Sequence, residues 1–410
     1  MSKIISPFNF SGNATVPPSK SYGQRALILS LFCDEMVRIS NLGESDDEQA
    51  LLRLLPHIGK KISFENGDVL IEKGSSFPEN TEINVGESGT ALRMLGVIAP
   101  FFAKEVILNG KGTLLQRKQG QLITFLEAAG CQVEHQNELL PIRIYGGIQQ
   151  IPKQINGSES SQVISGVAYL LPFINTESKI KIAQLKSKPY LEMTVDFLRS
   201  FQLDVNFDGL ELKGRGNQRL SSFTYTVEND WSGAANLLIG AALSGEITIL
   251  GLNPNSLQAD KKILGVLSDF GAKIKWSMNS ISVQKNQALP FQFDGTDCPD
   301  LLPIVAVLAC GASGKSTLKG MSRLQNKESN RALAICSFLE IFGVHFKLTT
   351  DQLQIYGTGK VKGGNVQCFN DHRIVIATTI AACISQQAIS IDTPSAVSKS
   401  FPRFFEIVNH

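Results

Sequence analysis

The sequence offers little to suggest a disulfide framework, a zinc site or a highly charged partner. Its seven cysteines are odd in number and form no C-x-x-C pair, which argues against structural disulfides and zinc and favours a reducing compartment. The formal net charge of +2 is too small to indicate nucleic acid or an anionic membrane surface as a partner. Clusters of metal ligands are absent from the sequence pattern, so neither a metal nor an organic cofactor is expected.

Long apolar runs are also missing. The first residues, Met-Ser-Lys-Ile-Ile-Ser-Pro-Phe, lack the apolar core of a signal peptide, and Leu301–Ala312 is too short to span a bilayer. With 43% apolar residues, the 410-residue chain fits a globular protein of about two or three domains. We expect a cytoplasmic monomer that binds small molecules and neither nucleic acid nor membrane.

What the chain does contain is a sixfold repeat. Strand-like runs of alternating β-branched residues begin at residues 37, 106, 180, 247, 316 and 389, so consecutive runs start 67 to 74 residues apart. A period of this length suits a compact supersecondary module. Each run follows a helix that is apolar nearly all round and is therefore predicted to be buried. These helices are expected at 24–33, 90–103, 161–173, 232–243, 301–310 and 373–383.

In five modules a second, amphipathic helix and a two-stranded hairpin follow the strand. Ile263–Phe270, stopped by Gly271 and followed by a hairpin over 273–284, is an example. The module is therefore β-α-β-α-β-β, and the fold class is α/β. The sixth module ends early, and N-terminal strands at 3–10 and 13–16 could supply its missing hairpin. That predicts two domains of three repeats, with the active site in the cleft between them; they comprise 20–228, and 1–19 plus 229–410.

Charged and hydroxyl side chains concentrate where the six buried helices begin. In the first, Pro17 and Pro18 stiffen the approach, and Lys20 and Arg25 stand near a helix start that favours an anion. Alone, this segment could be an ordinary capped surface helix. The arrangement returns in the other five modules, however, as Glu87-Ser-Gly89-Thr90 with Arg93, Ser160-Ser161-Gln162, Asp230-Trp-Ser232, Asp300, and Asn370-Asp371-His372-Arg373.

Six positive helix ends together with lysine and arginine predict a site for a small, multiply anionic ligand. Taken singly, Ser160, Ser232 and Asp371 could instead be helix caps. Acids beside such cations are candidates for proton transfer, with Asp300 and Glu328 foremost, although Glu328 could equally pair with Arg331 at i,i+3. Further cations stand in loops after the repeat strands: Arg117, Lys188, Lys327, Arg331 and Lys399.

One segment matches a known phosphate-binding motif only in part. Gly311-Ala-Ser-Gly-Lys-Ser316 resembles a phosphate-binding P-loop, but the pattern requires glycine where this chain has Ala309. The order of elements is also wrong, since an apolar helix precedes the segment and a strand-like Ser-Thr-Leu follows it. We interpret it as a helix-to-strand turn.

The chain resembles the EPSP synthase (3-phosphoshikimate 1-carboxyvinyltransferase) family over essentially its whole length. The motifs that carry the resemblance are Ser19-Lys20-Ser21 with Arg25, Gly89-Thr90-Ala91 with Arg93, Ser160-Ser161-Gln162, Ser187-Lys188-Pro189-Tyr190, Pro299-Asp300, Lys327-Glu328-Ser329 with Arg331, Asn370-Asp371-His372-Arg373, and Lys399-Ser400-Phe401-Pro402. The family's inverse α/β barrel fold, two domains of three β-α-β-α-β-β units, agrees with the repeat.

The resemblance implies transfer of the enolpyruvyl group of phosphoenolpyruvate to the 5-hydroxyl of shikimate 3-phosphate, with release of phosphate, in the shikimate pathway. By the same resemblance, shikimate 3-phosphate would be held by Lys20, Ser21, Arg25, Ser160, Ser161, Gln162, Ser187, Asp300 and Lys327. Phosphoenolpyruvate would be held by Lys20, Gly89, Arg117, Gln162, Arg331, Arg373 and Lys399. Asp300 would take the hydroxyl proton, Glu328 would protonate the methylene carbon, and Lys20 would act beside them.

Several positions depart from the family's usual pattern: Glu87, Met94, Lys118, Trp231, Gly233, Arg323 and Asn330. Two alternatives stay open. The related UDP-N-acetylglucosamine carboxyvinyltransferases usually carry a reactive cysteine in a loop that would fall near 108–117, where this chain has none. A repeat scaffold that only binds an anionic partner would not need Asp300 and Glu328 beside the cations.

Overall fold

The computed structural model describes residues 2–408, which divide into two compact units. The continuous unit is Lys20–Val227, and the discontinuous unit combines Met1–Ser19 with Glu228–His410. The second crossing thus lies between Val227 and Glu228, one residue from the expected boundary at 228/229. Within the described residues, no helix has the length and apolar character needed to cross a membrane.

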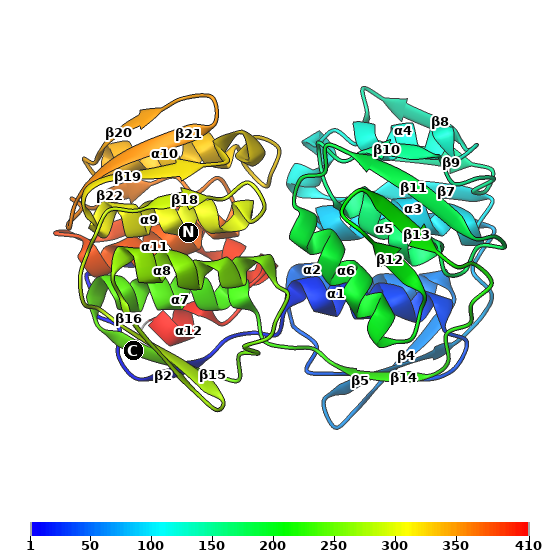
Figure 1. The fold of residues 1–410 in the computed structure, drawn as a ribbon, viewed down its shortest axis with the longest axis horizontal. Helices are drawn as coiled ribbons and strands as arrows, with labels where there is room; N and C mark the ends of the chain where they lie inside the picture. Colours follow the sequence, from blue (N-terminus) through cyan, green and yellow to red (C-terminus); the bar gives the residue numbers. More distant parts are fainter. Residues whose placement is uncertain (1, 409–410) are drawn as a thin grey trace. The chain divides into compact units, whose positions relative to one another are not determined.

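Both units alternate helices and strands, and the α/β class is confirmed (Figure 1). The helices of the continuous unit are α1 Lys20–Leu29, α2 Asp46–Leu54, α3 Gly89–Phe102, α4 Gly120–Ala128, α5 Gln162–Leu170 and α6 Lys188–Ser200. Its strands are β3 Val37–Ser40, β4 Lys60–Glu65, β5 Asp68–Lys73, β6 Asn80–Asn84, β7 Glu105–Asn109, β8 Gln132–Gln136, β9 Leu139–Tyr145, β10 Gln154–Asn156, β11 Ser178–Ala183, β12 Val205–Phe207, β13 Glu211–Gly214 and β14 Phe223–Thr226.

The discontinuous unit repeats this pattern. Its helices are α7 Trp231–Ser244, α8 Ile263–Phe270, α9 Leu302–Gly311, α10 Arg331–Ile341, α11 His372–Ala381 and α12 Phe404–Val408. Its strands are β1 Lys3–Ile5, β2 Asn13–Thr15, β15 Glu246–Leu250, β16 Lys273–Ser277, β17 Ser280–Gln284, β18 Gln292–Asp294, β19 Ser313–Lys319, β20 His345–Leu348, β21 Gln352–Thr358, β22 Gly364–Val366 and β23 Ile389–Ile391.

Three of the four-stranded sheets are built in the same way, each from one module. In the β6-β7-β9-β8 sheet the leading strand β6 pairs parallel with β7, in the register Thr81↔Val106, and the hairpin strand β9 pairs antiparallel with β7, in the register Val106↔Ile144. The β10-β11-β13-β12 and β18-β19-β21-β20 sheets follow the same order. The β-α-β-α-β-β module predicted from the repeat is thereby confirmed for these three.

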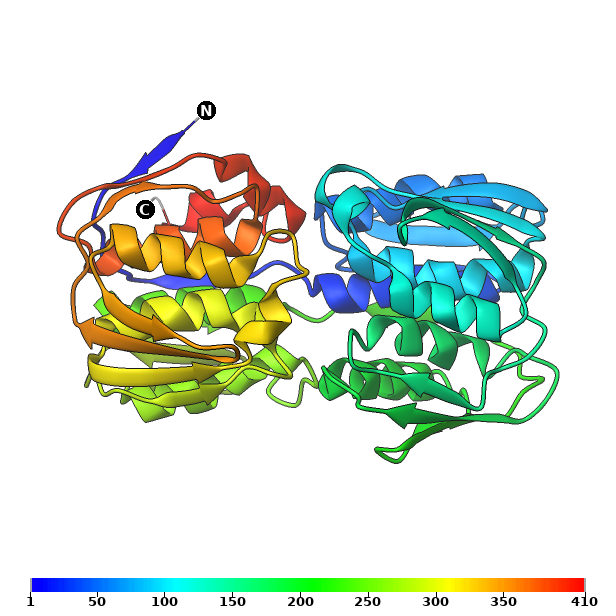
Figure 2. The same ribbon diagram turned by 90° about the horizontal axis from the view of Figure 1, so that it is seen from above.

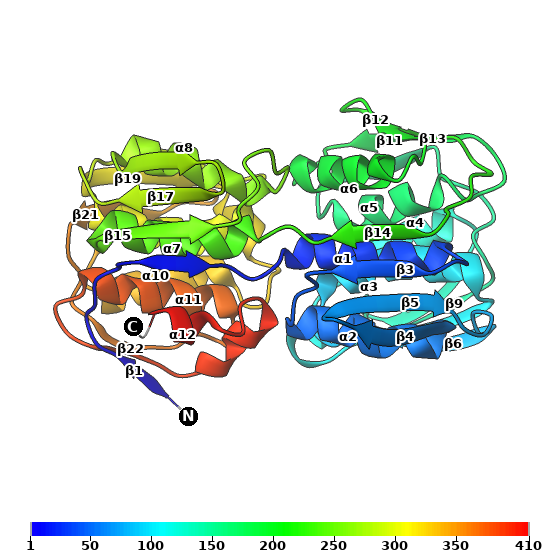
Figure 3. The same ribbon diagram turned by 90° about the horizontal axis from the view of Figure 1, so that it is seen from below.

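Next to the two points where the chain passes from one unit to the other, the short strands pair with a different module from the one expected. This corrects the expectation that strands at 3–10 and 13–16 supply the hairpin of the sixth module. β2 does not complete the sixth module; it pairs parallel with β15 of the fourth. β14, which precedes α7 in sequence, pairs parallel with β3 of the first module instead. Of the strands described before α1, β1 alone joins the sixth module, as one antiparallel strand on β23. Within residues 2–408 that sheet therefore has three strands and no hairpin (Figure 3).

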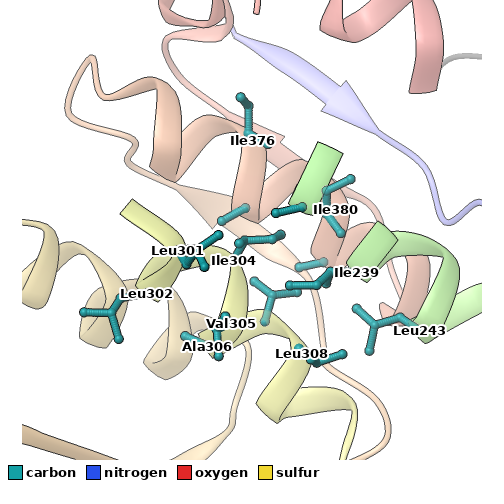
Figure 4. Close-up of a cluster of buried hydrophobic side chains, with 14 of the residues drawn as sticks. Ile239, Leu243, Leu301, Leu302, Ile304, Val305, Ala306, Leu308, Ile376 and Ile380 are labelled. Atoms are coloured by element: carbon teal, nitrogen blue, oxygen red, sulfur yellow. The ribbon is translucent and has the colours of Figure 1, made fainter. Parts of the chain in front are cut away.

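Six helices, one per module, make the core of the two units: α1, α3 and α5 in one, α7, α9 and α11 in the other (Figure 2). Every residue of α7, α9 and α11 is buried, as their all-round apolar sequences predict. Figure 4 shows Ile239 and Leu243 of α7 meeting Val305 and Leu308 of α9. α9 ends at Gly311 and β19 begins at Ser313, so the P-loop-like segment is a helix-to-strand turn, as expected.

Candidate active site

Arg331, the first residue of α10, is the centre of an ion-pair cluster in the discontinuous unit. Its Nε and Nη2 donate to the two carboxylate oxygens of Asp371 at 2.8 and 3.1 Å. Nη1 reaches Asp300 Oδ1 at 2.8 Å, and Nη2 also reaches Glu328 Oε2 at 2.5 Å. Burial by itself lowers the pKa of Arg331, but Asp371, Glu328 and Asp300 outweigh it and raise the pKa above its ordinary value. This guanidinium is therefore a permanent positive charge.

Asp300 lies in the 3-10 helix Pro299–Leu301, directly before α9. Besides Arg331, its carboxylate accepts hydrogen bonds from Lys327 Nζ at 3.3 Å and from Arg373 Nη2 at 3.5 Å. Burial raises the pKa of Asp300, but the charges of Lys327, Arg373 and Arg331 exceed that effect and hold its pKa well below the ordinary range. Asp300 is thus ionised at neutral pH and able to accept a proton from a ligand.

The start of α11 completes this cluster. Asp371 caps the helix, since its Oδ1 accepts from the backbone N–H of Arg373 at 2.9 Å, and its Oδ2 accepts from Ser329 Oγ at 2.9 Å. Lys399 Nζ donates to the carbonyl of Asn370 at 2.9 Å, which brings a further cation to the same helix end. The structure therefore brings together the site residues expected in this unit: Asp300, Lys327, Glu328, Arg331, Arg373 and Lys399.

In the continuous unit, Lys20 is the first residue of α1 and contacts the start of α2. Its Nζ donates to Asp47 Oδ2 at 2.8 Å, and Gln24 Nε2 approaches the same oxygen at 3.4 Å. Gln24 in turn accepts from Ser88 Oγ, the N-cap of α3, at 3.2 Å. Hydrogen bonds thus join the starts of three helices around the Lys20 ammonium group.

Arg25 stands one turn further along α1 and is buried. Its Nη1 donates to the Ser21 carbonyl at 2.7 Å, its Nη2 to the Tyr190 carbonyl at 3.0 Å, and its Nε to Thr194 Oγ1 at 2.9 Å. These bonds tie α1 to the first turns of α6, whose N-cap is the buried Ser187. Burial lowers the pKa of Arg25, which is what a positive charge held away from water should show.

The starts of α3 and α5 meet through Gln162. Its side-chain carbonyl accepts from Arg93 Nη1 at 2.7 Å, and its amide donates to Thr90 Oγ1 at 2.7 Å. The backbone N–H of Gln162 donates to Ser160 Oγ at 3.1 Å, and the buried Ser161 lies between the two. The N-cap residue is Ser161, whose side chain makes no capping hydrogen bond, and Ser160 instead closes a local turn on the first helical N–H.

Arg117 is buried near the start of α3. A Cβ added to Gly89 would lie 3.5 Å from Arg117 Nη1 and 3.2 Å from Arg93 Nη1, so two guanidinium groups flank the Gly89 backbone. Arg117 Nη2 donates to Thr113 Oγ1 at 2.7 Å. A helix N-terminus between two arginines is an environment in which phosphate or carboxylate groups bind well.

Ser232 and Asp371, the other two residues that the sequence left open as possible helix caps, have different outcomes. Asp230, not Ser232, caps α7, accepting from Gly233 N at 2.7 Å. Asp371 is both a cap and the partner of Arg331, and Glu328 does form the ion pair with Arg331. Among the residues that the structure describes, no group of three or more histidine, cysteine, aspartate or glutamate side chains could hold a metal ion.

Sequence reasoning missed the residues that hold the predicted ones in place: Asp47 beside Lys20, Thr194 beside Arg25, Thr113 beside Arg117, and Asp260. Asp260 is buried, and burial raises its pKa; Arg373 opposes this effect and Asp300 adds to it. Of these, only Asp47 stands in a pattern visible in the sequence, the Ser45-x-x-Glu48 capping box. Thr113 stands only four residues before Arg117, whereas Thr194 and Asp260 meet their partners only in the folded chain.

Comparison with known proteins identifies the family of this chain. A family model described as EPSP synthase (3-phosphoshikimate 1-carboxyvinyltransferase) matches residues 6–408. The 3-phosphoshikimate 1-carboxyvinyltransferase of Clostridium novyi is 34% identical over 416 residues, covering 98% of this chain and 95% of that protein. The enzyme of the same name from Methanocorpusculum labreanum is 33% identical, covering 98% and 97%. A solved EPSP synthase of Acinetobacter baumannii, 24% identical, shares the fold with a TM-score of 0.82 over 100% of this chain and 97% of that one. On the family match and these relatives, the chain belongs to the EPSP synthase (3-phosphoshikimate 1-carboxyvinyltransferase) family.

Proposed function

We propose that this chain transfers the enolpyruvyl group of phosphoenolpyruvate to the 5-hydroxyl of shikimate 3-phosphate, with release of phosphate. This is the reaction of the family to which the chain belongs, in the shikimate pathway to aromatic amino acids. The observation that supports it best is the Asp300 carboxylate, kept ionised by Lys327, Arg331 and Arg373. The surrounding cations keep this carboxylate ionised and would hold an anionic substrate beside it, which is the position that a general base needs, although they also lower its basicity.

The chemistry divides between two carboxyl groups. Glu328, which pairs with Arg331 as a carboxylate here, must first take up a proton. It then protonates the methylene carbon of phosphoenolpyruvate and creates cationic character at the neighbouring carbon. The 5-hydroxyl attacks that carbon and gives its proton to Asp300. Loss of phosphate and of one proton from the new methyl group then restores the double bond. We assign Lys20 a third catalytic role, as an ammonium group that offsets the negative charge of both substrates.

The binding roles that we propose follow the resemblance. Shikimate 3-phosphate would be held by Lys20, Ser21, Arg25, Ser160, Ser161, Gln162, Ser187, Asp300 and Lys327. Phosphoenolpyruvate would be held by Lys20, Gly89, Arg117, Gln162, Arg331, Arg373 and Lys399. Support comes from the geometry of each cluster: buried arginines beside helix N-termini offer both charge and directed N–H groups. The proposal requires residues of both units to act in one reaction.

We also propose a cytoplasmic monomer. All seven cysteines are free thiols, which suits a reducing compartment. Sedimentation velocity of the purified chain tests the monomer directly: a mass of about twice the 44.6 kDa of one chain would contradict it.

The test is phosphate release from phosphoenolpyruvate, measured with and without shikimate 3-phosphate. Release should require shikimate 3-phosphate, and Asp300→Asn should lower kcat by about 10²- to 10⁴-fold, the usual contribution of a general base. Asp269→Asn, a matched change at an exposed carboxyl on α8, is the control. Release only with UDP-N-acetylglucosamine would assign the chain to the alternative enzyme. Binding of both substrates without any release would favour the non-enzymatic scaffold.

A further inference from the structure

Glu87 stands two residues before α3 and is one of the positions where the chain departs from the usual family pattern. Its Oε2 accepts two hydrogen bonds from Thr113, one from the backbone N–H at 3.3 Å and one from Oγ1 at 3.1 Å. Thr113 belongs to the 3-10 helix Gly112–Gln116, which leads directly into Arg117. Thr113, near the start of this 3-10 helix, is thus hydrogen-bonded to Glu87 in the loop before α3.

The loop before α3 and the chain around residues 111–113 are held close together around the Glu87 carboxylate. The backbone N–H of Lys111 donates to the Gly86 carbonyl at 2.7 Å. Gly112 has φ +55°, and a Cβ there would lie 2.5 Å from Glu87 Cδ, so the carboxyl group packs against the Gly112 backbone. Only glycine combines this φ with such a close approach. The carboxylate therefore has little freedom to move away from Thr113.

The direction of the hydrogen bonds makes a relay of these residues. An ionised carboxylate only accepts, so the single hydrogen of the Thr113 hydroxyl is given to Glu87. The free lone pairs of Thr113 Oγ1 then accept from Arg117 Nη2 at 2.7 Å. Without Glu87 the hydroxyl could rotate and lose its fixed acceptor direction. The guanidinium at the end of the relay is the one that flanks the Gly89 backbone.

We propose that Glu87 is a positioning residue for phosphoenolpyruvate, acting through Thr113 to hold the Arg117 guanidinium at the start of α3. The inference rests on the proposed function, because it concerns one substrate of that reaction. Glu87 does not touch the substrate in this scheme. Its loss therefore affects the affinity for phosphoenolpyruvate more than the chemical step, and it leaves shikimate 3-phosphate binding unchanged.

The test compares Glu87→Ala, Thr113→Val and the double variant by steady-state kinetics. Each single change should raise the KM for phosphoenolpyruvate by about five- to twentyfold, the effect of losing a charge-assisted hydrogen bond. We expect kcat and the KM for shikimate 3-phosphate to change by less than about twofold. Because both residues act through one relay, the double variant should be no worse than the poorer single one.

Two further variants separate positioning from general damage. Glu87→Gln keeps an acceptor oxygen of the same reach and should restore most of the affinity for phosphoenolpyruvate. Glu82→Ala removes the nearby glutamate whose Oε1 accepts from Asn109 Nδ2 at 3.0 Å, and its KM values should equal those of the unaltered chain.

Additive effects in the double variant, an unchanged KM for phosphoenolpyruvate, or equal rises in both KM values would overturn the inference. If Glu87→Ala does not fold, Thr113→Val tests the same link from the other side. An unaltered chain without any phosphate release would refute the proposed function itself, and the inference with it. An active unaltered chain with unaffected variants would refute the inference alone.

Discussion

Glu48 should make the stability of the continuous unit depend on pH in a direction opposite to that of most carboxylates. It is buried, with Oε2 accepting from Ser45 Oγ at 2.6 Å and Oε1 from Gly43 N at 3.2 Å. The carboxylate also packs on Gly23, where an added Cβ would lie 2.1 Å from Oε1. Burial raises its pKa from 4.5 to about 7, although Ser45 and the charge of Lys20 partly oppose the rise.

The size of the pH effect follows from the difference between the folded-state and unfolded-state pKa of Glu48. When the folded-state pKa of a carboxyl is the higher one, its stabilising contribution is complete below the unfolded-state pKa and is lost as pH rises through the folded-state value. A difference of about 2.5 pKa units at 1.36 kcal/mol each sets a ceiling of about 3.4 kcal/mol. Between pH 5 and pH 8 the loss is about 2.5 kcal/mol, because the unfolded chain is already mostly ionised at pH 5.

Glu48→Gln removes the charge and keeps the shape, so it should remove this pH dependence. Relative to the unaltered chain, the variant should gain about 2.5 kcal/mol in the free energy of unfolding when the pH is raised from 5 to 8. Urea unfolding at both pH values measures this. Glu44→Gln, a neighbouring exposed glutamate, is the matched control and should show no such gain.

The two tryptophans provide an internal reference, since Trp231 and Trp276 both belong to the discontinuous unit. Far-UV circular dichroism reports on both units, whereas tryptophan fluorescence reports on one. If the units unfold separately, the shift should appear in the circular dichroism transition alone; if they unfold together, both probes should shift equally. A difference between Glu48→Gln and the unaltered chain that stays constant from pH 5 to pH 8 would refute the reasoning.

Three other changes have outcomes that the contacts determine. Asp371→Ala leaves the buried Arg331 guanidinium without its bidentate partner and should lower the free energy of unfolding by about 3–5 kcal/mol, seen as a lower urea midpoint; an unchanged midpoint would show that the pair contributes little. Arg25→Lys cannot supply donors to Ser21, Tyr190 and Thr194 together, and the KM for shikimate 3-phosphate should rise about tenfold with the KM for phosphoenolpyruvate little changed. Gly240→Ala places a methyl group 2.0 Å from the Phe10 ring in the core and should lower the thermal midpoint by several degrees, about 1–3 kcal/mol of overpacking; an unaltered midpoint would mean that the N-terminal segment shifts freely.

The repeat made much of the fold predictable. A helix that is apolar on all sides can only be buried, so α7, α9 and α11 were identified from composition and period alone. The polar residues at the six helix starts were conspicuous for the same reason, since buried helices seldom begin with charged groups. Whether the assigned residues bind substrate stays a prediction. A partner that orients one of them, such as Thr194, carries no local signal, because it stands 169 residues from Arg25 and meets it only after folding.

The sequence by itself determined the number of modules, their order of elements and the chemical character of each helix start, because these depend on local patterns of apolar and polar residues. Only the tertiary structure decided where the short strands β2 and β14 pair, since segments of three and four residues carry too little pattern to specify a partner. It also decided which charges meet. Arg331 and Asp371 stand 40 residues apart, and their pairing, like the raised pKa of Glu48, depends on burial that only the assembled core provides.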